Sequence, residues 1–98
     1  MAVDASDLAG ELETVIAQLS ATGIAELQPA INDLETVQQA MEEGIPNALV
    51  SDYRDRIISQ AGIVGRLATK LKNKELERIS RQLADIAVRL SARVGMRV

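Results

Sequence analysis

Residues 48–71 read ALVSDYRDRIISQAGIVGRLATKL, and this stretch carries the clearest pattern in the chain. An apolar side chain returns every seven residues, at Val50, Ile57, Val64 and Leu71. A seven-residue spacing keeps apolar side chains on one side of a helix, where a second helix can cover them. The pattern therefore predicts a long helix over residues 48–71 with an apolar seam along one side.

A turn signal precedes this helix at residues 44–47, which read GIPN. Glycine ends helices, proline cannot continue one, and asparagine caps the next. Before the turn, apolar residues recur at steps of three and four, which is the helical period. This spacing predicts one helix over about residues 5–20 and a second one ending at residue 43. Because Pro29 is tolerated only in a first turn, the second helix is expected to begin at residue 27 or 28.

The Lys72-Asn73-Lys74 segment interrupts the seven-residue pattern, since position 74 would be apolar if the pattern continued. We expect a tight turn there with Asn73 as the cap of a fourth helix, whose apolar stripe includes Leu83 and Leu90. Helices joined by such short connections pack antiparallel. The fold class expected is a single all-α domain over residues 1–98. It would be an up-down bundle of three to four antiparallel helices with coiled-coil-like aliphatic seams.

An alternative reading keeps residues 72–74 helical. The chain would then form one long hairpin that folds back at residues 44–46. Such a hairpin would need a second copy to cover its apolar stripes.

Composition argues against catalysis. The 98 residues include no His and no Cys, and Tyr53 is the only aromatic residue. The commonest general base, the commonest metal ligand and thiol nucleophiles are therefore missing. We expect no enzyme activity, no cofactor and no metal site.

Features of membrane or exported proteins are also missing from the sequence. No apolar stretch approaches the roughly 18–20 residues of a membrane span, and the acidic first residues do not resemble a signal peptide. The expected location is the cytoplasm of a bacterial or virus-infected host cell.

The charged residues are divided unequally between the two halves of the chain. Residues 1–50 contain nine acids and no Lys or Arg, which gives −9, whereas residues 51–98 contain 11 cations and five acids, which gives +6. Acid-first pairs four residues apart on a helix each contribute only ~0.2–0.5 kcal/mol. They explain part of the distribution, at Asp52–Arg56, Glu77–Arg81 and Asp85–Arg89.

Two interpretations pair the acidic half with the basic half. In the first, the pairing is internal. If the second and third helices fold back on each other, Glu35 lies near Arg54 or Arg56, and Glu26 lies near Arg66. In the second, the acidic half of one chain meets the basic half of another in a homodimer or larger assembly.

A third interpretation is a nucleic-acid contact by the basic half. Its cations include Lys72 and Lys74, and phosphate binding needs a positive face. The remaining candidates lie on the last predicted helix, at Arg78, Arg81, Arg89, Arg93 and Arg97. In a related variant, the acidic half imitates a nucleic acid and blocks a basic partner.

These observations favour a protein–protein interaction module that self-associates, with a dimer favoured. The role would be that of an adaptor, a small chaperone, an assembly component or an inhibitor, and the partner protein is not identified. The alternative is an accessory nucleic-acid-binding protein that uses residues 66–97. Interface candidates are Val50, Ile57, Val64, Leu71, Leu83, Leu90, Arg78, Arg81, Arg89 and Arg93.

Overall fold

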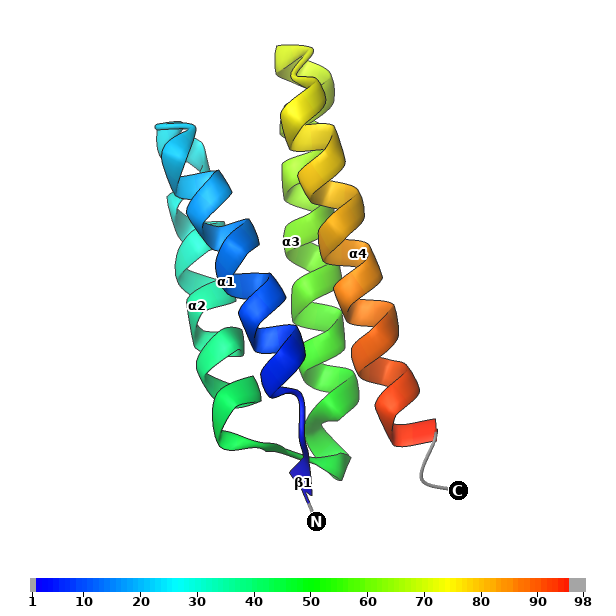
Figure 1. Ribbon diagram of the computed structural model, residues 1–98. Helices are drawn as coiled ribbons and strands as arrows, with labels where there is room; N and C mark the ends of the chain where they lie inside the picture. Colours follow the sequence, from blue (N-terminus) through cyan, green and yellow to red (C-terminus); the bar gives the residue numbers. More distant parts are fainter. Residues whose placement is uncertain (1, 96–98) are drawn as a thin grey trace.

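Four antiparallel helices make up most of the chain in the computed structural model, which describes residues 2–95 (Figure 1). The helices are α1 (Ser6–Ala21), α2 (Gln28–Glu43), α3 (Val50–Leu71) and α4 (Lys74–Gly95). They run up and down in sequence order, with each helix beside the next. The predicted all-α helical bundle is therefore confirmed. Within residues 2–95, no helix is long and apolar enough to cross a membrane.

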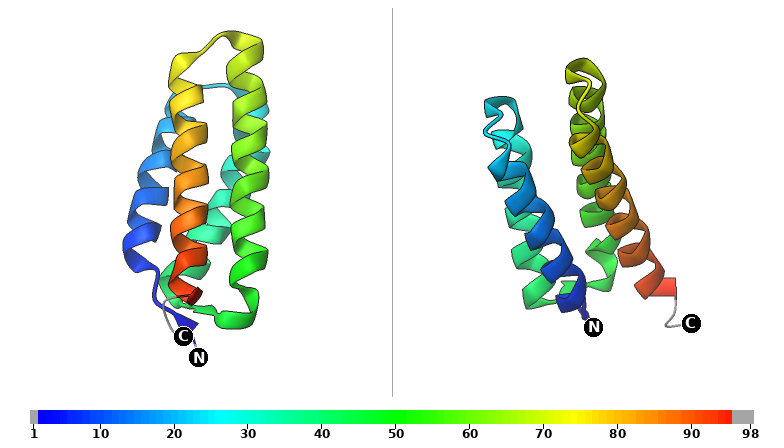
Figure 2. Two further views of the ribbon diagram at one scale, coloured as in Figure 1. Left: turned by 90° about the vertical axis from the view of Figure 1, so that its right-hand side faces the viewer. Right: turned by 45° about the horizontal axis from the view of Figure 1, so that its top comes forward.

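The bundle consists of two hairpins of unequal length. Helices α1 and α2 have 16 residues each, whereas α3 and α4 have 22 each. Six extra residues at 1.5 Å per residue lengthen a helix by about 9 Å. The α3–α4 hairpin accordingly reaches beyond the α1–α2 hairpin at the end where α3 meets α4 (Figures 1 and 2).

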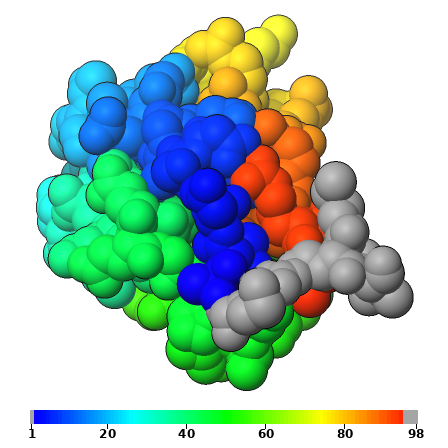
Figure 3. All heavy atoms as spheres, turned by 60° about the horizontal axis from the view of Figure 1, so that its bottom comes forward, coloured from blue at the N-terminus to red at the C-terminus, as the bar shows by residue number. Residues whose placement is uncertain are grey.

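Short elements close the opposite end of the bundle. Strand β1 (Ala2–Val3) pairs antiparallel with β2 (Ile45–Pro46), and Val3 and Ile45 are buried. Figure 3 brings this end forward and shows the first described residues between the α2–α3 connection and the end of α4. This pairing was not predicted, because two-residue strands have no periodicity to detect.

Both connections next to α2 contain a short 3-10 turn. The first is η1 (Ala25–Leu27), which leads into α2, and the second is η2 (Asn47–Leu49), which leads into α3. Regular helix therefore begins at Gln28 and at Val50. The first start agrees with the prediction from Pro29, and the second lies two residues later than predicted.

The turn between α3 and α4 confirms the interruption predicted at residues 72–74. Lys72 adopts a left-handed conformation, with φ of 53°, and the Asn73 backbone N–H donates to the Ala68 carbonyl oxygen at 2.9 Å. The Asn73 side-chain oxygen accepts a hydrogen bond from the Leu76 backbone N–H at 3.1 Å. Asn73 thus caps α4 as predicted, and the continuous-helix alternative is wrong.

Aliphatic side chains fill the interior. The predicted seam of α3 is buried at Val50, Ile57 and Val64, and Leu83 and Leu90 of α4 are buried with it. No buried polar or charged side chain occurs within residues 2–95. The interior is therefore closed by the helices of one chain.

Glycine allows α3 and α4 to approach closely. A Cβ atom at Gly65 would lie 3.1 Å from the Ser80 hydroxyl oxygen, and that hydroxyl donates to the Ala61 carbonyl oxygen at 2.8 Å. On α1, Gly10 provides a comparison, because a Cβ there would have nothing within 4 Å.

We expect the Gly65→Leu substitution to lower the free energy of unfolding by about 1–3 kcal/mol, because it overfills the α3–α4 contact. The matched Gly10→Leu substitution should raise the free energy of unfolding by up to ~1 kcal/mol, because leucine favours the helix more than glycine does. Urea unfolding followed by circular dichroism measures both changes. Equal effects of the two substitutions would contradict the close packing at Gly65.

Candidate interaction surfaces

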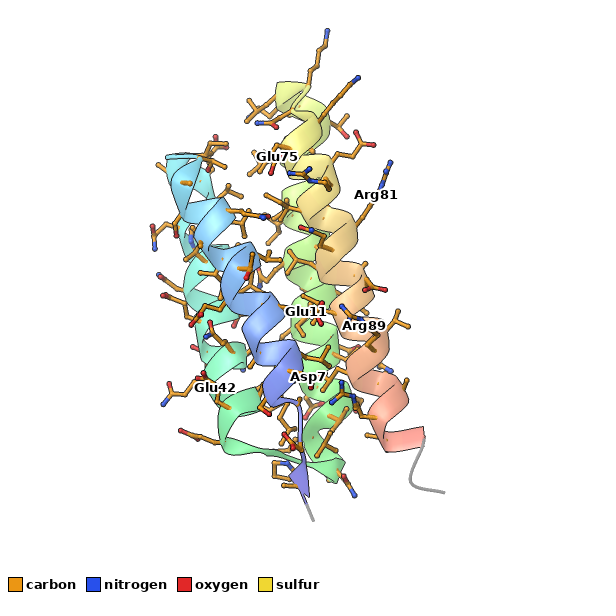
Figure 4. All side chains as sticks on the ribbon, viewed as in Figure 1. Asp7, Glu11, Glu42, Glu75, Arg81 and Arg89 are labelled. Carbon is orange, nitrogen blue, oxygen red and sulfur yellow. The ribbon has the colours of Figure 1, made fainter. Side chains whose placement is uncertain are left out.

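Ion pairs join α1 to α4 along their exposed edge. Arg93 donates to both carboxylate oxygens of Asp7, at 2.5 and 2.9 Å, and also to the Asp4 carbonyl oxygen at 2.9 Å. Arg89 donates to both carboxylate oxygens of Glu11, one of them at 2.8 Å, and also pairs with Asp85. Figure 4 shows Glu11 on α1 beside Arg89 on α4 at this edge, with Asp7 one turn earlier on α1. These contacts connect the acidic first half of the chain to its basic second half.

A second set of polar contacts joins α2 to α3. Asp33 accepts hydrogen bonds from Arg56, whose Nε lies 3.1 Å away, and from Gln60 at 2.9 Å. The Lys70 ammonium lies 3.8 Å from the Glu26 carboxylate. Gln60, which lies at a seam position in the sequence, therefore binds a carboxylate on the neighbouring helix.

The predicted internal pairing is present, but with different partners. Glu35 was expected near Arg54 or Arg56; instead Arg56 binds Asp33, and Arg54 binds the adjacent Asp55 at 2.9 Å. Glu26 was expected near Arg66, whereas it pairs with Lys70. The pairs joining α1 to α4 were not predicted, because they depend on how the first and last helices dock, which no spacing within either helix indicates.

Two of the three pairs predicted within single helices are confirmed. Arg81 binds Glu77 at 2.5 Å, and Arg89 binds Asp85 at 2.9 Å. The third pair, Asp52 with Arg56, does not form, because Arg56 turns towards Asp33 on α2 instead.

The structure separates the predicted interface residues into two groups. Five apolar candidates are at most 2% exposed and line the interior, namely Val50, Ile57, Val64, Leu83 and Leu90. The four arginines on α4 all form ion pairs within the chain. Arg78 binds Glu75, Arg81 binds Glu77, Arg89 binds Glu11 and Asp85, and Arg93 binds Asp7. Arg97 lies outside the described residues.

Leu71 differs from the other apolar candidates. Its side chain is 45% exposed, although the seven-residue pattern places it in the seam. It is the last residue of α3, beyond the length that α2 can cover, because α2 is six residues shorter. We call the residues around it, Lys70, Leu71, Lys72 and Lys74, the tip.

Several charges form no ion pair within residues 2–95, and they are unevenly placed. The cations among them are Arg66, Lys72 and Lys74, all in or next to the tip. The acids among them lie just before or on α1, on α2 and at the start of α3, namely Asp4, Glu13, Glu35, Glu42, Glu43 and Asp52. Glu42 projects away from the bundle in Figure 4. The surface therefore carries unpaired charge of opposite sign in different regions.

A shallow open groove of about 330 Å³ lies between α1 and α4, with Glu11 and Arg89 on its walls. The Arg89 Nε atom is buried beside it without a hydrogen-bond partner in the described part of the chain. Among residues 2–95, no three acidic side chains are grouped so that they could hold a metal ion.

The chain matches no family model, no curated protein and no solved structure.

The α1–α4 ion pairs predict a specific acid dependence of stability. The hydrogen bonds from Arg93 lower the pKa of Asp7 from 3.8 to about 2. Hydrogen bonds from Arg89 likewise lower the pKa of Glu11. A carboxyl whose pKa is lower in the folded state stabilises that state when ionised. For Asp7 this stabilisation is present above pH 3.8 and is lost as the pH falls towards about 2.

We expect the Arg93→Gln variant to melt below the wild type near neutral pH, and the difference to shrink as the pH falls from about 4 to about 2. Thermal melts across this range measure the difference. A Tm difference that stays constant with pH would contradict the role given to the Asp7–Arg93 pair.

Proposed function

We propose that this protein is a non-enzymatic protein–protein interaction module that recognises an acidic partner through the tip and also associates with copies of itself. Such a module serves as an adaptor, a small chaperone, an assembly component or an inhibitor. The observation that carries the proposal is the half-exposed Leu71, placed among Lys70, Lys72 and Lys74 at a protruding end.

The tip supports this proposal because its leucine is half exposed and two of its cations form no ion pair within residues 2–95. Leu71 keeps 45% of its surface exposed, so it contributes less to the interior than the buried leucines do. Lys72 occupies a left-handed position where glycine is the usual residue. An apolar anchor within a charged rim is a common arrangement at protein interfaces.

The charge of the tip indicates the character of the partner. Lys72 and Lys74 form no ion pair within residues 2–95, and Lys70 has only the long contact of 3.8 Å to Glu26. Unpaired cations attract acidic surfaces and speed association with them. We therefore infer a partner with an acidic surface around an apolar socket that takes up Leu71.

Photo-crosslinking tests the role of the tip. A benzophenone amino acid replaces Leu71 in one variant and the exposed Ala17 of α1 in a control, and both are expressed in the cells that naturally make the protein. We expect a protein adduct from position 71 only. We also expect Lys72→Glu together with Lys74→Glu to abolish the adduct, because two attractive charges become repulsive. No adduct at position 71, or equal adducts at both positions, would contradict the proposal.

The same cations support a second candidate, an accessory nucleic-acid-binding protein that uses residues 66–97. Arg66, Lys72 and Lys74 are free to neutralise phosphates, whereas Arg78, Arg81, Arg89 and Arg93 are held by acids of the same chain. Fluorescence anisotropy with labelled duplex DNA and single-stranded RNA discriminates between the candidates. The interaction module should show no binding at physiological salt. Tight binding that weakens steeply as salt rises would favour nucleic acid instead.

A further inference from the structure

The outward side of α3 carries a line of exposed residues that changes charge along its length. The line, which we call the outer stripe, consists of Asp52, Asp55, Ser59, Gly62, Arg66 and Lys70. Successive members are three or four residues apart, so they lie on one face of the helix. Ile58 adjoins the middle of the stripe and is 48% exposed. The outer stripe is therefore acidic at its start, uncharged in the middle and basic at its end.

The sequence of the outer stripe is self-complementary about the middle of α3, near Ala61. Asp52 lies nine residues before Ala61 and Lys70 lies nine residues after it. Asp55 and Arg66 lie six residues before and five residues after the same point. A surface whose two ends carry opposite charges matches a copy of itself after a two-fold rotation. Such self-complementarity is what a closed symmetric dimer requires.

We propose that two copies of this chain form an antiparallel dimer through their outer stripes. Asp52 of each copy pairs with Lys70 of the other, and Asp55 pairs with Arg66. Near the two-fold axis, Ile58 packs over Gly62 of the second copy. This inference rests on the self-association named in the proposed function. The outer stripe shares Lys70 with the tip but does not use Leu71, Lys72 or Lys74.

The middle of the stripe fits a close approach of two helices. Gly62 is exposed and has no side chain, and a Cβ built there would meet only the Arg66 guanidinium, at 3.8 Å. A glycine on an exposed helix face costs up to ~1 kcal/mol of helix stability relative to alanine. In the proposed dimer, the missing side chain of this glycine leaves room for Ile58 of the second copy, because small residues let helix backbones come together. This contact also covers an apolar side chain that the monomer leaves half exposed.

The existing contacts of the charged residues do not prevent this pairing. Asp52 and Arg66 form no ion pair within residues 2–95. Asp55 pairs with the adjacent Arg54, and Lys70 lies 3.8 Å from Glu26, but Asp55 and Lys70 are 65% and 70% exposed. Exposed pairs of this kind contribute at most about 1 kcal/mol and exchange readily. Each can therefore be replaced or shared when a second copy approaches.

The dimer should be weak and sensitive to salt. A contact between single helices buries less than the roughly 1,200–2,000 Å² of a stable standard interface. Four exposed ion pairs across it are screened as the ionic strength rises. We therefore expect the weight-average mass at low salt to rise with concentration from 10.6 kDa towards twice that value and no further. At high salt it should stay near the monomer mass.

Charge exchange tests the pairing, with sedimentation equilibrium as the measurement. Asp52→Lys with Asp55→Lys makes the stripe wholly basic, and Arg66→Glu with Lys70→Glu makes it wholly acidic. Each double variant alone should dimerise at least about tenfold more weakly than the wild type, because like charges then face each other. An equal mixture of the two should form a heterodimer, and a single chain carrying all four changes should dimerise again.

The tip provides a matched control. Lys72→Glu with Lys74→Glu changes the net charge as much as Arg66→Glu with Lys70→Glu does, but lies outside the stripe. This control should dimerise like the wild type. Circular dichroism verifies that each variant is folded. If a charge-reversed variant unfolds, a neutral double variant replaces it, either Asp52→Asn with Asp55→Asn or Arg66→Gln with Lys70→Gln. These neutral variants should weaken the dimer, and mixing them should not produce a heterodimer.

Three results would overturn the proposed dimer. The first is a wild type that stays monomeric at low salt and high concentration. The second is equal weakening by the stripe and tip variants, and the third is a mixture that fails to associate. A monomeric wild type that still gives a foreign protein adduct from position 71 would refute the dimer alone. If the chain still dimerises but position 71 gives no adduct with a foreign protein, only the proposed recognition through the tip is refuted.

Discussion

The structure depends on the burial of aliphatic side chains between four helices of a single chain. The interior contains leucine, isoleucine, valine, alanine and methionine, and no polar side chain is buried within residues 2–95. Burying one large aliphatic side chain contributes about 1.5–3 kcal/mol, far more than any exposed ion pair. Because the interior is closed and uniform in chemistry, the charged residues remain on the surface.

The division of charge along the sequence has a structural consequence within the bundle. The acidic helices α1 and α2 lie beside the basic helices α4 and α3, so ion pairs connect the two hairpins at Asp7–Arg93, Glu11–Arg89 and Asp33–Arg56. Exposed pairs add little to stability, but they disfavour arrangements that place like charges together. The ion pairs thus help to select one packing of the hairpins. Among the cations of residues 2–95, the ones without an ion pair are Arg66, Lys72 and Lys74, which lie in the outer stripe or at the tip.

The local features of the fold could be predicted from sequence because short-range rules determine them. Residues 44–47 and Asn73 were identified as breaks by their own chemistry, and the buried side of α3 followed from its seven-residue spacing. The exposure of Leu71 could not be predicted in this way. It depends on where α2 begins relative to the end of α3 in space, and the spacing within α3 contains no information about the length of its neighbour.

The pairing of charges was predictable only in part for the same reason. Contacts four residues apart depend on one helix, and two of the three expected pairs form. Contacts such as Glu11–Arg89 join residues far apart in the chain and depend on how the two hairpins dock. The outer stripe became visible only when the structure distinguished the buried side of α3 from its exposed side. The exposed side carries the charge pattern, and the predicted seam lies on the other.

One chain closes its own interior, and the proposed association of copies is an added, charge-driven property. The most direct measurement combines sedimentation with far-ultraviolet circular dichroism during dilution at high salt, where charge-driven contacts are screened. We expect a particle of 10.6 kDa that keeps its full helical signal at every concentration. A helical signal that falls as the protein is diluted would show that the interior forms only between chains, and would contradict the account.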